Sequence, residues 1–251
     1  MNSTLLRRLL DIADDSAIIS DVNIFLNWVI VKSREYAMST LFLDMPGLDK
    51  PCGMSTFMGD IIGKKAIETA EEFLVSKESL KVAVGMACLK SILPHISVFD
   101  EGNAIDRHRE EAHTSPTCFI GHFDEAEKWR SKGDPVDIIE LFPRPGDIHW
   151  NDSQKVLAKA ELVFITGLTL VNNTFDEVIR RTPKAKHRII MGPTVPMSTE
   201  LFDFGVDHIG GTLIKGPAAT MVYCSRGGGS IAHAPKGALQ KVNIFRGGGV
   251  S

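Results

Sequence analysis

The sequence has few cysteines, and none of them is spaced for a metal site or a disulfide framework. Thiolate zinc sites and disulfide-stapled secreted domains both need closely spaced cysteines. No C-x-x-C pair occurs here, and long intervals separate the four cysteines, which are Cys52, Cys88, Cys118 and Cys224. We therefore exclude both classes and expect a cytoplasmic protein.

The sequence also lacks a long apolar run and an excess of charge of one sign. No run approaches the roughly 20 apolar residues that span a bilayer, and the N-terminal stretch MNSTLLRRLLDIADD carries acids that a signal peptide would not have. The formal net charge is −3, from 28 basic and 31 acidic residues, whereas nucleic acids and anionic membranes favour a basic face. We predict a globular protein whose partner is a small-molecule ligand, with no nucleic acid and no membrane. A homodimer is left open.

The first 98 residues predict an α+β domain, because strands and helices follow one another there in separate groups. Residues 44–59 form a loop rich in proline and glycine, which at about 16 residues is long enough to suggest a binding role. The expected elements are a helix at 3–14, strands at 22–31 and 36–43, a helix at 60–75, and a helix that Ser76 caps and Pro94 ends.

Residues 99–116 are polar, and we interpret them as the connection between two domains. His108, Glu110, Glu111 and His113 lie in this stretch and could be metal ligands. HREEAH is not the H-E-x-x-H motif, however, and a spacing of five turns the two histidines away from a shared helix face. We therefore expect a solvated charged run, and we assign no metal ligand to the sequence.

From residue 117 to residue 251, strands and helices alternate, which predicts a Rossmann-like parallel sheet with helices on both faces. Thr174 begins a capping box with Glu177, which marks a helix start. The expected strands lie at 118–121, 136–141, 161–166, 188–191, 207–213 and 241–245, with helices between them at 124–132, at 152–159 and after Thr174.

One stretch of this second domain has the spacing of a nucleotide-binding unit. Gly121 closes the first strand, and Glu140 follows it at close to the interval of about 20 residues at which such units place the acid that binds a ribose. The residues after Gly121 contain no second glycine, and a pyrophosphate needs a glycine-rich turn. S-adenosylmethionine, which has no pyrophosphate, therefore fits better than NAD. The alternative to a nucleotide site is that Gly121 only ends a strand and that Glu140 is a solvated acid without a ligand.

Ligands of parallel α/β sheets bind outside the carboxyl ends of the strands. Four such ends carry glycine or polar residues, and we expect them to converge on one crevice. They are Gly121, Glu140, the Thr166-Gly167 turn and the stretch 192–194.

Several segments resemble a known family. The proteins in question are described as "putative heavy-metal chelation" proteins, and the resemblance covers most of the chain. The matching segments are GLTLVNNTFDEVI at 167–179, MGPTVPMSTELFDFGVDHIGG at 191–211, IGHF at 120–123, Glu140, the Pro-Gly-Asp at 145–147 and VGMACLKSIL at 84–93. The resemblance implies an enolase N-terminal-like α+β domain at 1–98, a connection at 99–116, and a Rossmann-like domain at 117–251 with the ligand in the cleft between the two domains.

Two positions depart from the family pattern. The family commonly has an asparagine where Lys90 stands, and often has an acid near Lys215. Both changes introduce an amine. If either amine faces the ligand, this member can carry out chemistry that its relatives do not.

The first functional hypothesis is an enzyme that uses S-adenosylmethionine as a cosubstrate. Glu140 would bind the ribose hydroxyls, Asp147 the adenine amino group, and polar groups of the later strand ends the amino-acid portion. The expected cofactor-binding residues are Gly121, His122, Glu140, Asp147, Thr166, Gly167, Thr169, Asn172 and Thr194.

A sulfonium is a cation with a good leaving group, which suits either methyl transfer or an internal displacement. The displacement would release methylthioadenosine and leave a small cyclic amino acid, so the enzyme would be a transferase or a lyase. It needs a base for the α-proton, and the catalytic candidates are Lys90, Tyr36 and Lys215, with Tyr223 as a further candidate. A lysine serves only if burial lowers its pKa; a solvated surface amine is the alternative for each.

The second hypothesis is a protein that binds a heavy metal or a metal–chelator complex without catalysis. It needs soft or imidazole ligands in the crevice. His122, His149 and Cys118 lie near the right strand ends, but their spacing is not diagnostic. NAD-dependent redox chemistry is disfavoured, because Gly121 is not followed by further glycines.

Overall fold

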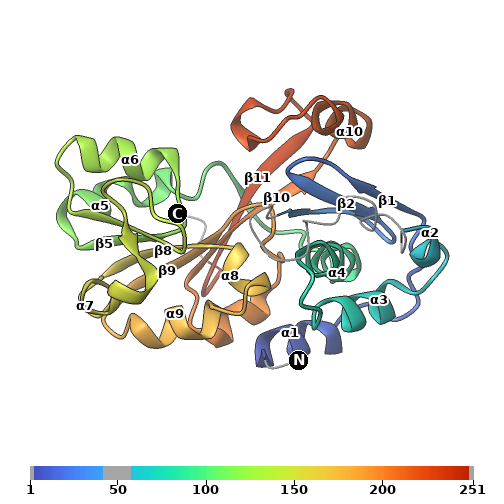
Figure 1. Cartoon of the computed structure of the whole chain (residues 1–251), viewed down its shortest axis with the longest axis horizontal. Helices are drawn as coiled ribbons and strands as arrows, with labels where there is room; N and C mark the ends of the chain where they lie inside the picture. Colours follow the sequence, from blue (N-terminus) through green and yellow to red (C-terminus); the bar gives the residue numbers. More distant parts are fainter. Residues whose placement is uncertain (1–2, 42–57, 249–251) are drawn as a thin grey trace. The chain divides into compact units, whose positions relative to one another are not determined.

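The computed structural model describes residues 3–41 and 58–248, so the predicted loop at 44–59 lies outside the described residues except for its last two positions. The chain divides into two compact units, and Figure 1 shows the elements of each. The first unit comprises residues 1–97, 196–200 and 211–240, and the second comprises residues 98–195, 201–210 and 241–251.

The first unit contains a three-stranded antiparallel sheet of order β1-β2-β3. Its strands are β1 (Asp21–Ile24), β2 (Trp28–Lys32) and β3 (Tyr36–Thr40). The single strand predicted at 22–31 is therefore wrong. The backbone N–H of Phe25 donates to the carbonyl oxygen of Trp28 over 2.8 Å, which turns the chain between β1 and β2. The strand predicted to start at Tyr36 is confirmed.

Helices complete the first unit. Ser3 caps α1 by accepting a hydrogen bond from the N–H of Leu6 over 3.4 Å, as predicted. The helix predicted at 60–75 is broken, because Gly63 has a φ of 86° and ends one helix before the next begins. The helix α10 was not predicted. The helices are α1 (Thr4–Asp11), α2 (Met58–Ile61), α3 (Ala66–Phe73), α4 (Ser79–Ile92) and α10 (Pro217–Ser225), with a short 3-10 turn η5 (Ile231–His233).

The larger sheet in the described part of the chain has eight strands in the order β4-β11-β10-β9-β8-β5-β6-β7. The strands from β10 to β7 pair in parallel, and β4 pairs antiparallel to β11. This confirms the predicted Rossmann-like parallel sheet. The strands are β4 (Asp100–Glu101), β5 (Thr117–Ile120), β6 (Val136–Glu140), β7 (Ile148–His149), β8 (Leu162–Thr166), β9 (His187–Met191), β10 (His208–Ile214) and β11 (Leu239–Phe245).

Helices cover both faces of the parallel strands, as predicted. Figure 1 shows α5 and α6 on one side of β5 and β8, and α7 and α9 on the other. On the first side, Phe119 of β5 and Phe164 of β8 stack with ring centroids 4.3 Å apart, and Trp129 of α6 packs on both rings. The helices are η2 (Asp106–His108), α5 (Arg109–Thr114), α6 (Asp124–Ser131), η3 (Trp150–Asp152), α7 (Gln154–Leu157), α8 (Leu168–Val171), α9 (Phe175–Arg181) and η4 (Thr199–Phe204).

The division of the chain differs from the predicted one in two ways. Residues 99–116 belong to the second unit instead of forming a free connection, because Ala104, Ile105 and Ala112 are buried in its core. Residues 211–240, predicted within the second domain, cluster with the first unit. Patterns of local periodicity reveal strands and helices, but they do not reveal which core a late segment joins. Among the described residues, no helix has the length and apolar character that crossing a membrane requires.

Candidate functional site

The parallel strands place most of the predicted cofactor-binding residues at one edge of the second unit's sheet, which we call the carboxyl edge. The strand β5 pairs with β6 on one side and with β8 on the other, and all three run in parallel. The chain continues outward from β5 to β6 and β7, and then crosses back to β8 and β9. The gap between the carboxyl ends of β5 and β8 is therefore the topological switch point, where ligands of open α/β sheets bind.

Gly121 and the Thr166-Gly167 turn flank this switch point. Gly121 has a φ of 104°, and a Cβ there would lie 3.0 Å from Cβ and Cγ2 of Thr166. A Cβ on Gly167 would lie 2.7 Å from Cγ2 of Val195. Only glycine allows these turns to approach one another so closely. The structure thus brings together the ends of β5, β8 and the segment after β9, as the sequence predicted.

Glu140, the last residue of β6, is half-buried next to this point. Burial raises the pKa of its carboxyl group, and the backbone N–H groups of His122 and Leu141 partly offset that effect. The Leu141 N–H lies 3.2 Å from Oε2. A carboxylate beside the first βα turn is the group that binds ribose hydroxyls in nucleotide-binding sheets. Glu140 thus lies at the strand end where the sequence placed it, and its contact with a ribose stays a prediction.

Asp147 lies in the loop after β6, as predicted, but its side chain is held by neighbouring protein groups. Its side chain is fully buried, and Oδ1 accepts from Nη1 of Arg130 over 3.0 Å. Oδ2 lies 3.3 Å from Nδ1 of His122 and accepts from the backbone N–H of Arg144 over 3.2 Å. Both oxygens are occupied, so Asp147 anchors the loop after β6 and holds His122. The expected contact with an adenine amino group has no support in this arrangement.

The residues predicted to hold the amino-acid portion shape the turns after β8 and β9. The Thr169 hydroxyl is buried and donates to the carbonyl oxygen of Thr166 over 2.8 Å. Oδ1 of Asn172 accepts from the N–H and the hydroxyl of Thr174, over 3.1 and 2.6 Å. The capping box predicted at Thr174 does not form, because the Thr174 side chain makes no hydrogen bond that caps the helix. The helix α9 nevertheless begins at the next residue, as predicted. Thr194 is buried as well.

The predicted catalytic residues Lys90, Tyr36 and Lys215 belong to the first unit. Nζ of Lys90, on α4, donates to the carbonyl oxygen of Met38 over 2.6 Å. Burial lowers the pKa of this amine to about 7, which meets the condition that a lysine base requires. Tyr36 is half-buried. Lys215 is exposed, which agrees with the alternative prediction that it is a surface amine.

Tyr223, the further base candidate, is held by a local contact. Its hydroxyl donates to the carbonyl oxygen of Ser230 over 2.6 Å and accepts from the Ser230 N–H over 3.2 Å. The hydroxyl therefore closes the loop after α10, and this favours a structural role.

The titration of Lys90 should be visible in the stability of the protein. A lysine in an unfolded chain has a pKa of about 10.4, whereas the pKa of Lys90 is about 7. Between these values the unfolded state binds more protons, so the free energy of unfolding should rise as the pH is raised from about 7 to about 10. In Lys90→Met this rise should be reduced, and in the control Lys64→Met, which removes an exposed amine, it should persist. Urea unfolding at several pH values measures the free energy of unfolding. An equal rise in both variants would contradict the lowered pKa of Lys90.

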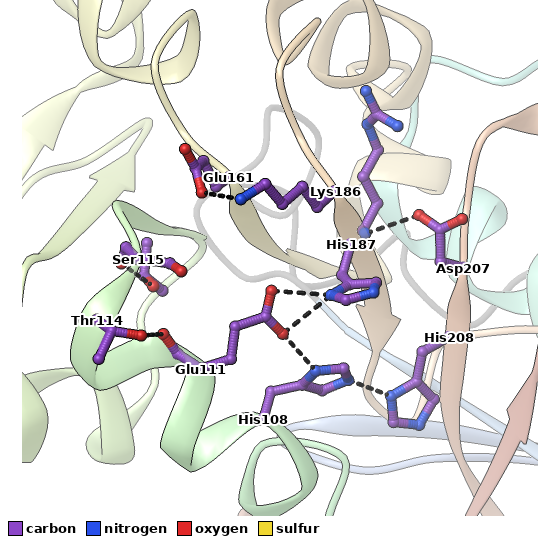
Figure 2. A network of polar contacts seen from close by, with 11 residues as sticks. His108, Glu111, Thr114, Ser115, Glu161, Lys186, His187, Asp207 and His208 are labelled. Carbon is purple, nitrogen blue, oxygen red and sulfur yellow. Dashed lines mark hydrogen bonds and ion pairs between the residues drawn. The ribbon is translucent and has the colours of Figure 1, made fainter.

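A second group of polar residues lies at the amino ends of β9 and β10, and Figure 2 shows it. We call His108, Glu111, His187 and His208 the histidine cluster. His108 ends η2, Glu111 lies on α5, and the other two histidines open β9 and β10. Nδ1 of His187 lies 2.8 and 2.9 Å from the two carboxylate oxygens of Glu111. Nδ1 of His108 lies 3.3 Å from Oε2 of the same carboxylate.

The environment of the histidine cluster corrects the prediction of a solvated run at 99–116. The His108 side chain is only 13% exposed, and burial is the main cause that lowers its pKa. Burial also lowers the pKa of His208 to about 4, while Asn243 partly offsets the effect through a hydrogen bond. The prediction that His108 and His113 do not share a face agrees with the structure, since His113 contacts Asp134 instead.

Two family models cover most of the chain. Each is described as "Putative heavy-metal chelation"; one matches residues 103–243 and the other matches residues 6–93. The first match alone spans more than half of the sequence. The chain belongs to this family. The two matches meet between residues 93 and 103, where the sequence predicted the end of the first domain.

This family member is similar to one curated protein in sequence and to two crystal structures in fold. An uncharacterized protein of Methanocaldococcus jannaschii is 26% identical over 185 residues, which cover 69% of this chain and 71% of that protein. Crystal structures of two family members of unknown function superpose on 96% of this chain and 98% of theirs. The protein from Desulfitobacterium hafniense gives a TM-score of 0.83 at 16% identity, and the one from Pyrococcus horikoshii gives 0.72 at 17%.

In the part of the chain that the structure describes, no group of three possible metal ligands forms at the carboxyl edge, where the chelation hypothesis required one. Cys118 is buried within β5, and burial raises the pKa of its thiol. Nδ1 of His149 accepts from the N–H of Asn151 over 3.1 Å, and His122 contacts Asp147. Among the described residues, a group of three possible ligands occurs instead in the histidine cluster.

Only two members of the histidine cluster could be paired from the sequence alone. His108 and Glu111 are three residues apart, a spacing that places two side chains on one face of a helix. His187 and His208 come from strand starts far along the chain, and only the order of the strands brings them to the same place. His187 was therefore missed, and the pair considered, His108 and His113, was the wrong pair.

Proposed function

We propose that this member of the family binds an adenosyl ligand at its carboxyl edge and acts on it as an enzyme, with S-adenosylmethionine as the cosubstrate. The observation that carries the proposal is the half-buried carboxyl group of Glu140 beside Gly121 and the Thr166-Gly167 turn. Sheets of this kind bind nucleosides at the switch point, and an acid at the end of the second strand binds the ribose.

The start of α6 favours a ligand without phosphates. In nucleotide-binding sheets the first helix begins at the ligand and its N-terminus attracts a phosphate. Here the first turn of α6 carries three acids, Asp124, Glu125 and Glu127. These charges repel a pyrophosphate, and they favour a cation. A sulfonium compound meets both conditions, whereas NAD carries a pyrophosphate and fails the first.

The reaction is proposed to be methyl transfer or an internal displacement. In the displacement, a base takes the α-proton, the α-carbon electron pair displaces the thioether from the γ-carbon, and methylthioadenosine leaves. Lys90 is the best base candidate, because its lowered pKa keeps a fraction of the amine neutral near pH 7. Tyr36, which is half-buried, and Lys215, which is exposed, remain candidates of lower rank.

Calorimetric titration of the metal-stripped protein tests the proposal. S-adenosylmethionine and S-adenosylhomocysteine should bind in the micromolar range, and NAD should bind at least about tenfold more weakly because of the acids that open α6. Incubation with S-adenosylmethionine should then release methylthioadenosine or S-adenosylhomocysteine, which chromatography separates. If neither adenosyl compound binds, or if NAD binds more tightly than both, the proposal is wrong.

A further inference from the structure

The histidine cluster contains a carboxylate placed between two imidazole rings. Nδ1 of His187 and Nδ1 of His108 both face the carboxylate of Glu111, as Figure 2 shows. One ligand atom from each of the three residues can be chosen so that all lie within 4.8 Å of one another. Which of these nitrogens carries a proton decides whether the cluster is an ordinary hydrogen-bonded group or a cation site.

The proton on His208 is fixed by Asn243 of β11. Nδ2 of Asn243 donates to the carbonyl oxygens of Gly102 and Asp100, over 3.0 and 3.4 Å. The amide oxygen must therefore point to His208, and it lies 2.9 Å from Nε2. Since an amide oxygen only accepts hydrogen bonds, Nε2 of His208 carries the proton. In a neutral ring Nδ1 of His208 is then a bare acceptor.

The contact between His208 and His108 fixes which nitrogen of His108 carries the proton. Nε2 of His108 lies 2.9 Å from Nδ1 of His208, so Nε2 must donate and Nδ1 of the neutral His108 ring carries a lone pair. That lone pair faces Oε2 of Glu111 at 3.3 Å. Two acceptors that face each other across this distance repel, unless a proton or a metal ion lies between them or beside them.

We propose that His108, Glu111 and His187 are the ligands of a divalent transition-metal ion, and that His208 and Asn243 are positioning residues that hold His108 in the ligand tautomer. Metal-bound histidines usually donate their second ring N–H to a fixed acceptor, most often a carboxylate, a backbone carbonyl or water; here the acceptor is Nδ1 of His208. Two imidazoles and one carboxylate suit Zn²⁺ and its neighbours rather than Mg²⁺ or Ca²⁺, and the absence of a thiolate from the cluster disfavours the softest ions.

The geometry also leaves room for further ligands on the metal. The side chain of His187 is half exposed, so water or a small molecule could complete the coordination of an ion held by three protein groups. The nearby amine of Lys186 is held by the carboxylate of Glu161 at 2.6 Å, which limits its repulsion of a cation. The site lies at the amino ends of β9 and β10, at the opposite ends of the strands from the carboxyl edge.

Titration with Zn²⁺ and Co²⁺ tests this assignment without any ligand or activity. Metal-stripped protein should bind about one equivalent of Zn²⁺, and the Co²⁺ form should show visible absorption bands of a four- or five-coordinate ion with nitrogen ligands. Glu111→Gln and His187→Ala should each weaken Zn²⁺ binding at least about tenfold. The matched control Glu110→Gln changes an exposed neighbouring acid and should bind as the unaltered protein does.

A separate variant tests whether His208 positions His108. His208→Phe removes the acceptor for His108, so Zn²⁺ affinity should fall several-fold and the Co²⁺ spectrum should change, while the ligands themselves remain. An unchanged spectrum and affinity in this variant would overturn the role of His208. The metal site itself is overturned if the unaltered protein binds no Zn²⁺, or if Glu111→Gln and His187→Ala bind it as Glu110→Gln does. If Glu111→Gln does not fold, His187→Ala, whose side chain is half exposed, decides the question.

Discussion

Glu140→Ala is expected to lower the affinity for S-adenosylmethionine by about tenfold to a hundredfold. Hydrogen bonds from ligand hydroxyls to a charged acceptor contribute about 1.5–3 kcal/mol, and each 1.4 kcal/mol corresponds to about a tenfold change in affinity. Glu140 is half-buried, so solvent weakens these bonds less than at an open surface, and the backbone N–H groups of His122 and Leu141 hold the carboxyl group in place. Calorimetric titration of the variant measures the loss.

A matched control separates the loss of ribose binding from a general effect of charge. Glu72→Ala removes an exposed carboxylate from α3 and should bind S-adenosylmethionine as the unaltered protein does. Glu140→Gln retains one acceptor oxygen and should lose less affinity than Glu140→Ala. Equal affinities in Glu140→Ala and Glu72→Ala would show that the end of β6 does not contact the ligand.

Phe164→Ala is expected to lower the free energy of unfolding by about 3–5 kcal/mol, because it removes a large side chain from the centre of the second unit. Phe164 is fully buried in β8. It stacks on Phe119 at 4.3 Å and contacts Trp129 edge-on at 6.0 Å. The cavity could not close easily, since sheet and helix are fixed around it. Urea unfolding followed by circular dichroism gives the change.

The same substitution on the surface provides the control. Phe142 follows β6, and 62% of its surface is exposed, so Phe142→Ala should change the free energy of unfolding by no more than about 0.5 kcal/mol. A small effect in Phe164→Ala, close to that of Phe142→Ala, would contradict the packing of α5 and α6 on β5 and β8.

Much of the second unit could be predicted from the sequence, because its strands are short apolar runs that alternate with amphipathic helices. Runs such as CFI after Thr117 and VFI before Thr166 mark buried parallel strands. The first unit was harder. The turn that separates β1 from β2 contains Phe25, Leu26 and Asn27, with no glycine or proline, so the apolar run continued through it and predicted one strand.

The candidate site was predictable only to the level of strand ends. Parallel pairing brings the residues after β5, β6 and β8 to one edge whatever their side chains do, which is why Gly121, Glu140 and Thr166 lie together. Side-chain direction inside a loop depends on partners elsewhere. Arg130 of α6 binds Asp147, so an acid that looked available for adenine is occupied.

Contacts between residues that are distant in the chain could not be predicted from the sequence for a similar reason. The histidine cluster depends on β9 and β10 lying side by side, and on Asn243 of β11 lying next to His208. No local period encodes those pairings. The sequence therefore predicted which strand ends meet at one edge of the sheet, and it missed the group at the other end.

A crystal structure of the protein with S-adenosylhomocysteine, which cannot react, tests the central claim most directly. The account predicts that the ribose hydroxyls lie within about 3.2 Å of the Glu140 carboxylate, beside Gly121 at the ends of β5 and β6. A nucleoside bound away from these strand ends, or no bound nucleoside at a saturating concentration, would contradict it.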